Sequence, residues 1–122
     1  MEIREQHQNG ILILQLSAQI DATTGPALSE KFEAAIRGGN VRLVLDLSDV
    51  PYISSAGLRV LSIALKAVRD QKNGGDLCLT NLSRTVAHAF RISGFNQVFN
   101  IYDTVDEAIA VLAASQEMNT DW

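Results

Sequence analysis

The residues that point most directly to chemistry are two adjacent serines, Ser54 and Ser55, in the segment PYISSAGLRVL (51–61). They stand where an aliphatic run of β type gives way to an apolar run with helical spacing. A phosphate-binding turn, a nucleophilic serine, a modification site and a plain helix cap all place hydroxyl groups at such a junction. The neighbouring residues separate these four interpretations.

A catalytic serine of the hydrolase type belongs to a Gly-x-Ser-x-Gly motif with a histidine base. Here Ile53 stands where that motif has its first glycine, two residues before Ser55. His7 and His88 fall in a strand pattern and midway along a polar helix pattern, so we expect both at the surface. A P-loop would need a longer glycine-rich turn, and His7, His88 and Cys78 lack metal-ligand spacing. We therefore expect no enzymatic activity and no cofactor.

A helix cap and a modification site remain. The hydroxyl of Ser54 or of Ser55 could accept a hydrogen bond from an unpaired amide of the following helix. Ala56 and Gly57 then follow, although glycine costs about 1 kcal/mol against alanine in a helix interior and less near its end. We interpret these small residues as keeping the helix entrance open, so that another molecule can reach the hydroxyl.

Composition limits the class of protein that could carry this turn. The chain has 122 residues, 47% hydrophobic and 20% charged, which is typical of one globular domain. Its net charge of −4 argues against nucleic acid or an anionic membrane as a partner. There is no signal-peptide pattern and no apolar run of membrane-spanning length, and Cys78 cannot form an internal disulfide. We therefore expect a cytoplasmic protein.

The elements that must position the serines follow from apolar spacing. Two alternating segments, 2–8 and 10–20, are expected to form a hairpin that turns at Asn9-Gly10. The later elements are expected to be a helix from Pro26 to Gly38-Gly39, a strand at 41–48, a helix from the serine turn to Gly74-Gly75, a strand at 76–82, a helix at 83–94, a strand at 97–102 and a helix at 104–115. The domain would then cover 1–115, with a polar C-terminal tail at 116–122.

This order predicts an α/β fold. Strands that alternate with helices require crossover connections and hence parallel pairing, whereas the N-terminal hairpin is antiparallel. We expect a mixed sheet of four or five strands with helices mainly on one face, and an exposed turn at 54–57. The helix after the serines is apolar well beyond one stripe, because Val60, Ile63, Ala64 and Ala67 join the core positions. Such a helix is either deeply buried or shares a second face with a partner.

Three segments together resemble the STAS domain, in its stand-alone form as a bacterial anti-sigma factor antagonist. The most specific is Ser-x-Gly-Leu at 55–58, after an aliphatic strand that ends in Asp-Leu-Ser at 46–48. The early AQIDATT (18–24) and the later ISGF (92–95) occur in the order expected for that family. The resemblance covers nearly the whole chain apart from the tail.

The resemblance implies a switch in partners. An anti-sigma factor that is also a serine kinase would bind the unmodified domain and release its sigma factor. Phosphorylation of Ser55 would abolish binding, and a serine phosphatase would restore it. The resemblance also places Asp21 in a loop near the phosphoacceptor, with Ala56, Gly57, Leu58 and Arg59 around it. Many members carry Asp immediately before the acceptor, where this chain has Ser54, which makes Ser54 a candidate second acceptor or a support of the turn.

Two other functions stay open at this point. A STAS scaffold could bind its partner without ever being phosphorylated. A domain of this type could also bind a nucleotide or another small ligand within a signalling complex.

Overall fold

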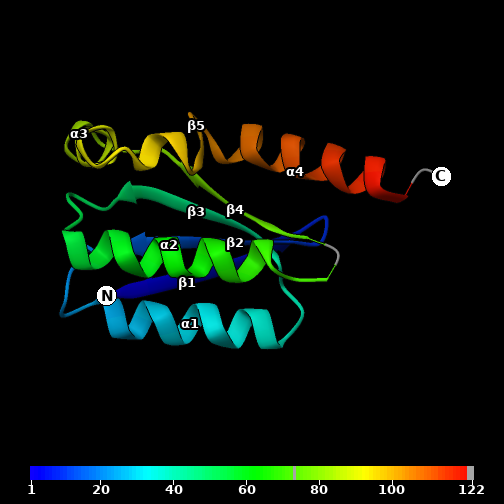
Figure 1. Ribbon diagram of the computed structural model, residues 1–122, viewed down its shortest axis with the longest axis horizontal. Coiled ribbons are helices and arrows are strands. Elements are labelled where there is room, and N and C mark those ends of the chain that lie inside the picture. Colours follow the sequence, from blue (N-terminus) through cyan, green and yellow to red (C-terminus); the bar gives the residue numbers. More distant parts are fainter. Residues whose placement is uncertain (73, 121–122) are drawn as a thin grey trace.

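The computed structural model describes residues 1–72 and 74–120, with side chains up to residue 114. Strands and helices follow the order that the sequence predicts (Figure 1), although the strand expected at 97–102 covers only Asn100–Tyr102 and a 3-10 turn precedes it. The elements are β1 (Glu2–Gln8), β2 (Ile11–Ser17), α1 (Gly25–Arg37), β3 (Arg42–Asp49), α2 (Ser55–Arg69), β4 (Asp76–Thr80), α3 (Arg84–Ser93), the 3-10 turn η1 (Phe95–Gln97), β5 (Asn100–Tyr102) and α4 (Val105–Thr120).

The strands form a five-stranded mixed sheet in the order β1-β2-β3-β4-β5. The β1–β2 pair is antiparallel, and the three remaining pairs are parallel. Asn9 and Gly10 have φ angles of 55° and 76°, the left-handed conformation that a two-residue hairpin turn needs. The predicted fold class and the hairpin are therefore confirmed.

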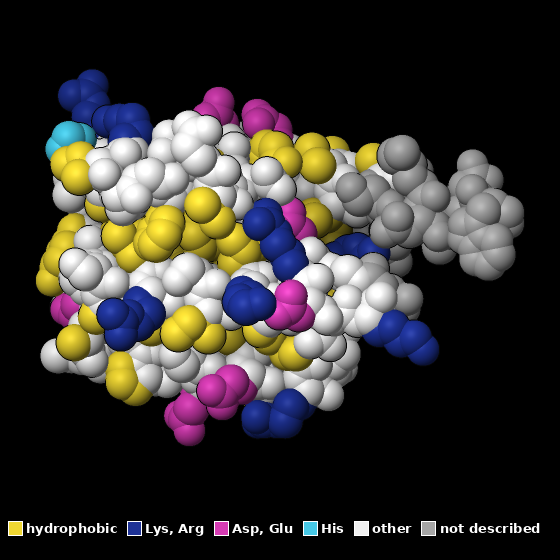
Figure 2. Space-filling model, in the orientation of Figure 1, with side chains coloured by type: hydrophobic (Ala, Val, Ile, Leu, Met, Phe, Trp, Pro, Cys, Tyr) yellow, Lys and Arg dark blue, Asp and Glu magenta, His cyan; other side chains and the backbone are white. Residues whose placement is uncertain are grey.

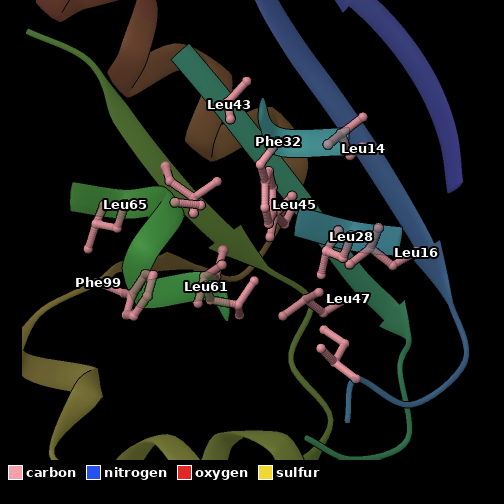
Figure 3. Packing of buried hydrophobic residues seen from close by; sticks show 14 of the residues in the cluster. Leu14, Leu16, Leu28, Phe32, Leu43, Leu45, Leu47, Leu61, Leu65 and Phe99 are labelled. Carbon is pink, nitrogen blue, oxygen red and sulfur yellow. The ribbon is translucent and has the colours of Figure 1, made fainter. Parts of the chain in front are cut away.

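The two faces of the sheet carry cores of unequal size. Alternation sends Leu43, Leu45 and Leu47 of β3 into the larger core, which includes the buried faces of α1 and α2 and is drawn in Figure 3. Val44 points to the opposite face, where α4 packs against β3, β4 and β5. The buried residues of α3, Val86 and Phe90, join the larger core. By these contacts the helices lie mainly on one face, and α4 covers the other. Figure 1 shows α1 and α2 side by side, with α4 on the other side of the strands.

The last helix is longer than the sequence pattern indicated. The hydroxyl of Thr104 accepts a hydrogen bond from the Glu107 amide at 3.2 Å at its start. The helix then continues to Thr120, whereas a polar tail was expected from Gln116. Polar residues can extend an established helix because propagation is far easier than nucleation. Residues 121 and 122 of the expected tail lie outside the described residues, and the domain boundary at 115 stays a prediction.

Candidate functional site

Ser54 caps α2. Its backbone is extended, with φ −91° and ψ 174°, and its Oγ accepts a hydrogen bond from the Gly57 amide at 3.2 Å. Its carbonyl oxygen accepts a second bond from the Leu58 amide at 2.9 Å. Both oxygens of Ser54 are therefore committed to the start of the helix, which resolves the choice of cap in favour of Ser54.

Ser55 occupies the first position of α2 and is exposed to solvent. Within the described part of the chain, its hydroxyl has no hydrogen-bond partner, and neither its amide nor that of Ala56 has an acceptor. Those two amides are among the donors that an α-helix leaves unpaired at its N-terminus. The two neighbouring serines thus differ: one hydroxyl holds the turn, and the other is accessible.

Gly57 has a different role from the one the sequence suggested. A Cβ at this position would lie 2.7 Å from Cγ1 of Ile53 and closer still to the backbone oxygen of Ile20. No real side chain fits there without displacing backbone. The absence of a side chain at Gly57 therefore allows the start of α2 to pack against the Ile20 loop, and access for a partner does not explain it.

The loop between β2 and α1 is attached to the residues just before the serine turn. The Ser54 amide donates to the Ile20 oxygen at 2.9 Å, and the Ile20 amide donates to the Tyr52 oxygen at 3.2 Å. Ile20 and Ile53 also form an isolated parallel bridge. Because Asp21 follows Ile20 directly, its loop lies beside the serine turn. The role of Asp21 in partner binding stays a prediction.

Asp21 organises its own loop. Its Oδ1 accepts hydrogen bonds from the Thr23 hydroxyl at 2.6 Å, the Thr23 amide at 2.9 Å and the Thr24 amide at 3.1 Å. The pKa of the Asp21 carboxyl is lowered from its usual 3.8 to about 2, mainly because the Thr23 hydroxyl donates a hydrogen bond to it. These bonds give Asp21 a structural role in its own loop, in addition to the place near the phosphoacceptor that the resemblance implies.

Tyr52 is the site residue that the sequence analysis missed. Its hydroxyl donates to Oδ2 of Asp21 at 3.4 Å, and its side chain is 43% exposed. No sequence signal predicted this contact, because the two residues are distant along the chain. The contacts of Thr23 and Thr24 with Asp21 could have been predicted from the sequence. An Asp followed by Thr two and three residues later is typical of a turn capped by the Asp side chain.

The exposed face of α2 continues the site away from the serine turn. Leu58 is in the core, so it supports the turn from beneath, whereas Arg59 is exposed. Ile63 is 64% exposed, although the same helix has an apolar face fully in the core. A shallow groove of about 60 Å³ runs beside Ile63 between α2 and α1, and Phe32 and Val60 line part of it. Figure 2 shows hydrophobic and basic side chains interleaved over these two helices.

A second hollow, of about 350 Å³, lies where β4 and β5 end. Asn81, Arg91, Tyr102 and Asp103 contribute polar groups to its lining. The Oδ1 atom of Asn81 is buried and has no hydrogen-bond partner among the residues that the structure describes. Ligands of open α/β sheets commonly bind outside the carboxyl ends of parallel strands, which is where this hollow lies.

The remaining chemistry-bearing residues stand apart from the serine turn. His7 and His88 are exposed on β1 and α3, as expected, and Cys78 is buried in β4. In the described ranges, no three His, Cys, Asp or Glu side chains are grouped so that they could hold a metal ion. None of the described helices is both long enough and apolar enough to span a membrane.

Comparison with known sequences adds a family and named relatives. A family model described as the STAS domain matches residues 2–108. The chain is 34% identical to BtrV of Bordetella bronchiseptica over 110 residues, which are 90% of this chain and 93% of that protein. It is 35% identical to the anti-sigma-B factor antagonist of Bacillus subtilis over 98 residues, 80% of this chain and 85% of the relative.

Solved structures show the same fold at lower identity. An anti-sigma factor antagonist from Mycobacterium paratuberculosis superposes with a TM-score of 0.81 at 22% identity, covering 91% of this chain and 92% of the other. The Bacillus cell fate determinant SpoIIAA in its phosphorylated form superposes with a TM-score of 0.63 at 19% identity, covering 89% of this chain and 97% of the other.

Proposed function

The chain belongs to the STAS domain family, and on that premise we propose that it is an anti-sigma factor antagonist switched by phosphorylation of Ser55. In its unmodified form it binds an anti-sigma factor that is also a serine kinase, and the sigma factor is released. Phosphorylation of Ser55 ends this binding, and a serine phosphatase restores it. The domain acts by binding, without catalysis of its own, and it works in the cytoplasm where sigma factors act.

The observation that carries this proposal is the difference between the two serines. The Ser54 hydroxyl is engaged with the Gly57 amide at 3.2 Å, whereas the Ser55 hydroxyl is exposed and unengaged among the described residues. A kinase needs a hydroxyl that it can reach without unfolding the helix. Ser55 meets that requirement, and Ser54 remains the support of the turn.

The modification suits the place where it would occur. The kinase transfers the γ-phosphoryl group of ATP to Oγ of Ser55, the hydroxyl proton is lost, and ADP leaves. The product carries about −1.5 to −2 charges near neutral pH. The unpaired amides of Ser55 and Ala56 and the helix dipole favour an anion at this position, so the fold itself need not change.

The same phosphate is unfavourable for the binding of the partner. It would have to desolvate a phosphate next to the Asp21 loop, in a chain that already carries a net charge of −4. The exposed Ile63 and the groove beside it extend the candidate contact surface along α2. A phosphate at the end of this surface disrupts binding locally, through charge and bulk, without a long-range transition.

The test is phosphosite mapping with a co-purified kinase. The native protein is isolated from its own cells with bound partners, and the complex is incubated with ATP before mass spectrometry of its peptides. Label is expected in wild type and Ser54→Ala and not in Ser55→Ala. Label that persists in Ser55→Ala but disappears in Ser54→Ala would move the acceptor by one residue. A bound kinase that labels neither serine would contradict the switch.

One observation favours a second function. The hollow at the ends of β4 and β5 has the size of a small-ligand site, and the buried Oδ1 of Asn81 has no hydrogen-bond partner in the described part of the chain. Calorimetry with nucleotides tests this alternative, with Arg91→Ala as the variant that removes the main cation of the hollow. A STAS scaffold that is never phosphorylated is a third option. Intact-mass analysis after incubation with the bound kinase and ATP separates it from the switch.

A further inference from the structure

We propose that Arg59 binds the phosphate on Ser55 within the same helix, so that phosphorylation also withdraws the exposed guanidinium from the partner. This inference rests on the proposed function, because it concerns the phosphorylated state of Ser55. It assigns a specific role to Arg59, which the family pattern placed only in the surroundings of the phosphoacceptor.

The helix brings the two residues together. Ser55 is the first residue of α2, and Arg59 stands four residues later on the same helix. Side chains at i and i+4 lie on the same face, with about 5–6 Å between their Cβ atoms. Both residues are exposed, so no packed side chain has to move when they meet. A long arginine side chain easily spans the remaining distance to a phosphate.

The direction of the pair is also favourable. An acidic group N-terminal to a basic group at i, i+4 stabilises a helix more than the reverse order, because each charge then complements the helix dipole. A guanidinium can donate two parallel hydrogen bonds to a phosphate, which makes arginine better suited to this contact than lysine.

Arg59 differs from the other cations of α2. Lys66 is 2.9 Å from Asp70, and Arg69 is 3.2 Å from Asp76, so each has a carboxylate partner. Among the described side chains, none forms an ion pair with Arg59. Its guanidinium is therefore available to the phosphate without breaking an existing ion pair.

The start of α2 also lacks the acidic group that such a position favours. The first turn contains no Asp or Glu, and its only side-chain cap is the neutral Ser54 hydroxyl. A phosphate on Ser55 would supply the missing negative charge and would contact both the unpaired amides and Arg59. The Asp21 carboxylate, in the neighbouring loop, acts in the opposite sense because it repels the phosphate.

The test installs the phosphate directly. Phosphoserine is incorporated at position 55 by genetic code expansion in wild type, Arg59→Gln, Arg59→Lys and Lys66→Gln, and the second pKa of the phosphate is measured by ³¹P NMR. Lys66→Gln is the matched control, because it removes one positive charge from the same helix at a greater distance from Ser55. Circular dichroism confirms that each variant is folded.

We expect the phosphate pKa to rise by about 0.15–0.4 pH unit in Arg59→Gln relative to wild type, from the usual strength of i, i+4 ion pairs. The phosphate pKa in Arg59→Lys should lie between the values in wild type and Arg59→Gln, and the phosphate pKa in Lys66→Gln should equal that in wild type. The difference should shrink in 1 M salt, where the Debye length is about 3 Å. An unchanged pKa in Arg59→Gln, or an equal rise in Lys66→Gln, would overturn the pairing.

This experiment separates the inference from the proposed function. The phosphate is introduced without a kinase, so the pairing can be measured even if no kinase labels Ser55. Conversely, a chain that is phosphorylated at Ser55 but shows no effect of Arg59→Gln retains the switch and refutes the role of Arg59.

Discussion

The Cα of Gly57 approaches the backbone carbonyl of Ile20 so closely that a methyl group cannot be placed between them. This contact joins the start of α2 to the loop that carries Asp21. The position of the accessible Ser55 hydroxyl relative to that loop therefore depends on a glycine two residues further along the chain.

Gly57→Ala should destabilise the domain by about 1–3 kcal/mol, the usual cost of overpacking a close contact. Chemical denaturation measures this change. Gly38→Ala is the matched control, because its added Cβ would meet its nearest neighbours at an ordinary 3.5 Å and its φ is −80°. Equal stability of the two variants would show that the backbone at Ile20 can move away from an added Cβ at little cost.

Ser54→Ala should lower the free energy of unfolding by about 1 kcal/mol, because it removes the N-cap of α2. Ser55→Ala should stay within about 0.5 kcal/mol of wild type, since that hydroxyl is exposed and unengaged. Thermal and denaturant unfolding of both variants provide the comparison. A larger loss in Ser55→Ala would mean that Ser55 caps the helix in solution.

Ser55→Glu should weaken binding to the co-purified anti-sigma factor by about tenfold or more, because the partner must then desolvate an added charge. Ser55→Ala should bind like wild type, since it adds neither charge nor bulk. Calorimetry with the purified partner gives both affinities. Glutamate has less charge and fewer acceptor oxygens than a phosphate, so the phosphorylated chain should bind more weakly still. Equal affinities for all three forms would contradict the switch.

Asp21→Asn should lower the free energy of unfolding near neutral pH. In acid, the variant and wild type should become more similar in stability. The pKa of Asp21 is lowered from 3.8 to about 2 in the folded protein, so the ionised carboxylate contributes stability above its unfolded pKa. That contribution is lost as pH falls through the folded pKa. The difference in unfolding free energy between wild type and Asp21→Asn should therefore shrink between about pH 4 and pH 2. A difference that is constant over this range would exclude the carboxylate charge as its cause.

Cys78 should react with iodoacetamide only after unfolding. Burial raises the pKa of its thiol to about 12, with a further contribution from the Asp76 carboxylate, so almost no thiolate exists at pH 8. Mass spectrometry of the native chain should show no adduct on a timescale at which the denatured chain is fully modified. Rapid labelling of the native protein would indicate that β4 opens locally.

The sequence alone determined the order of the main elements and the class of fold. The Asn9-Gly10 turn, the aliphatic strand expected at 41–48 and the helical spacing after the serines are local signals, because propensity, turn chemistry and side-chain periodicity operate over a few residues. The Ser-x-Gly-Leu motif added the family resemblance, and with it the interest in Ser55 and Asp21.

The tertiary structure decided what each residue of the site does. Serine is a common N-cap residue, so the sequence allows either Ser54 or Ser55 to cap the helix. The backbone geometry gives that role to Ser54 and leaves the Ser55 hydroxyl accessible. The close approach of Gly57 to Ile20 and the bond from Tyr52 to Asp21 join segments that are distant along the chain. Such contacts depend on how the sheet folds these segments together, and no local pattern encodes them. The same reason applies to α4, whose place on the opposite face follows from which side of the sheet its connection crosses.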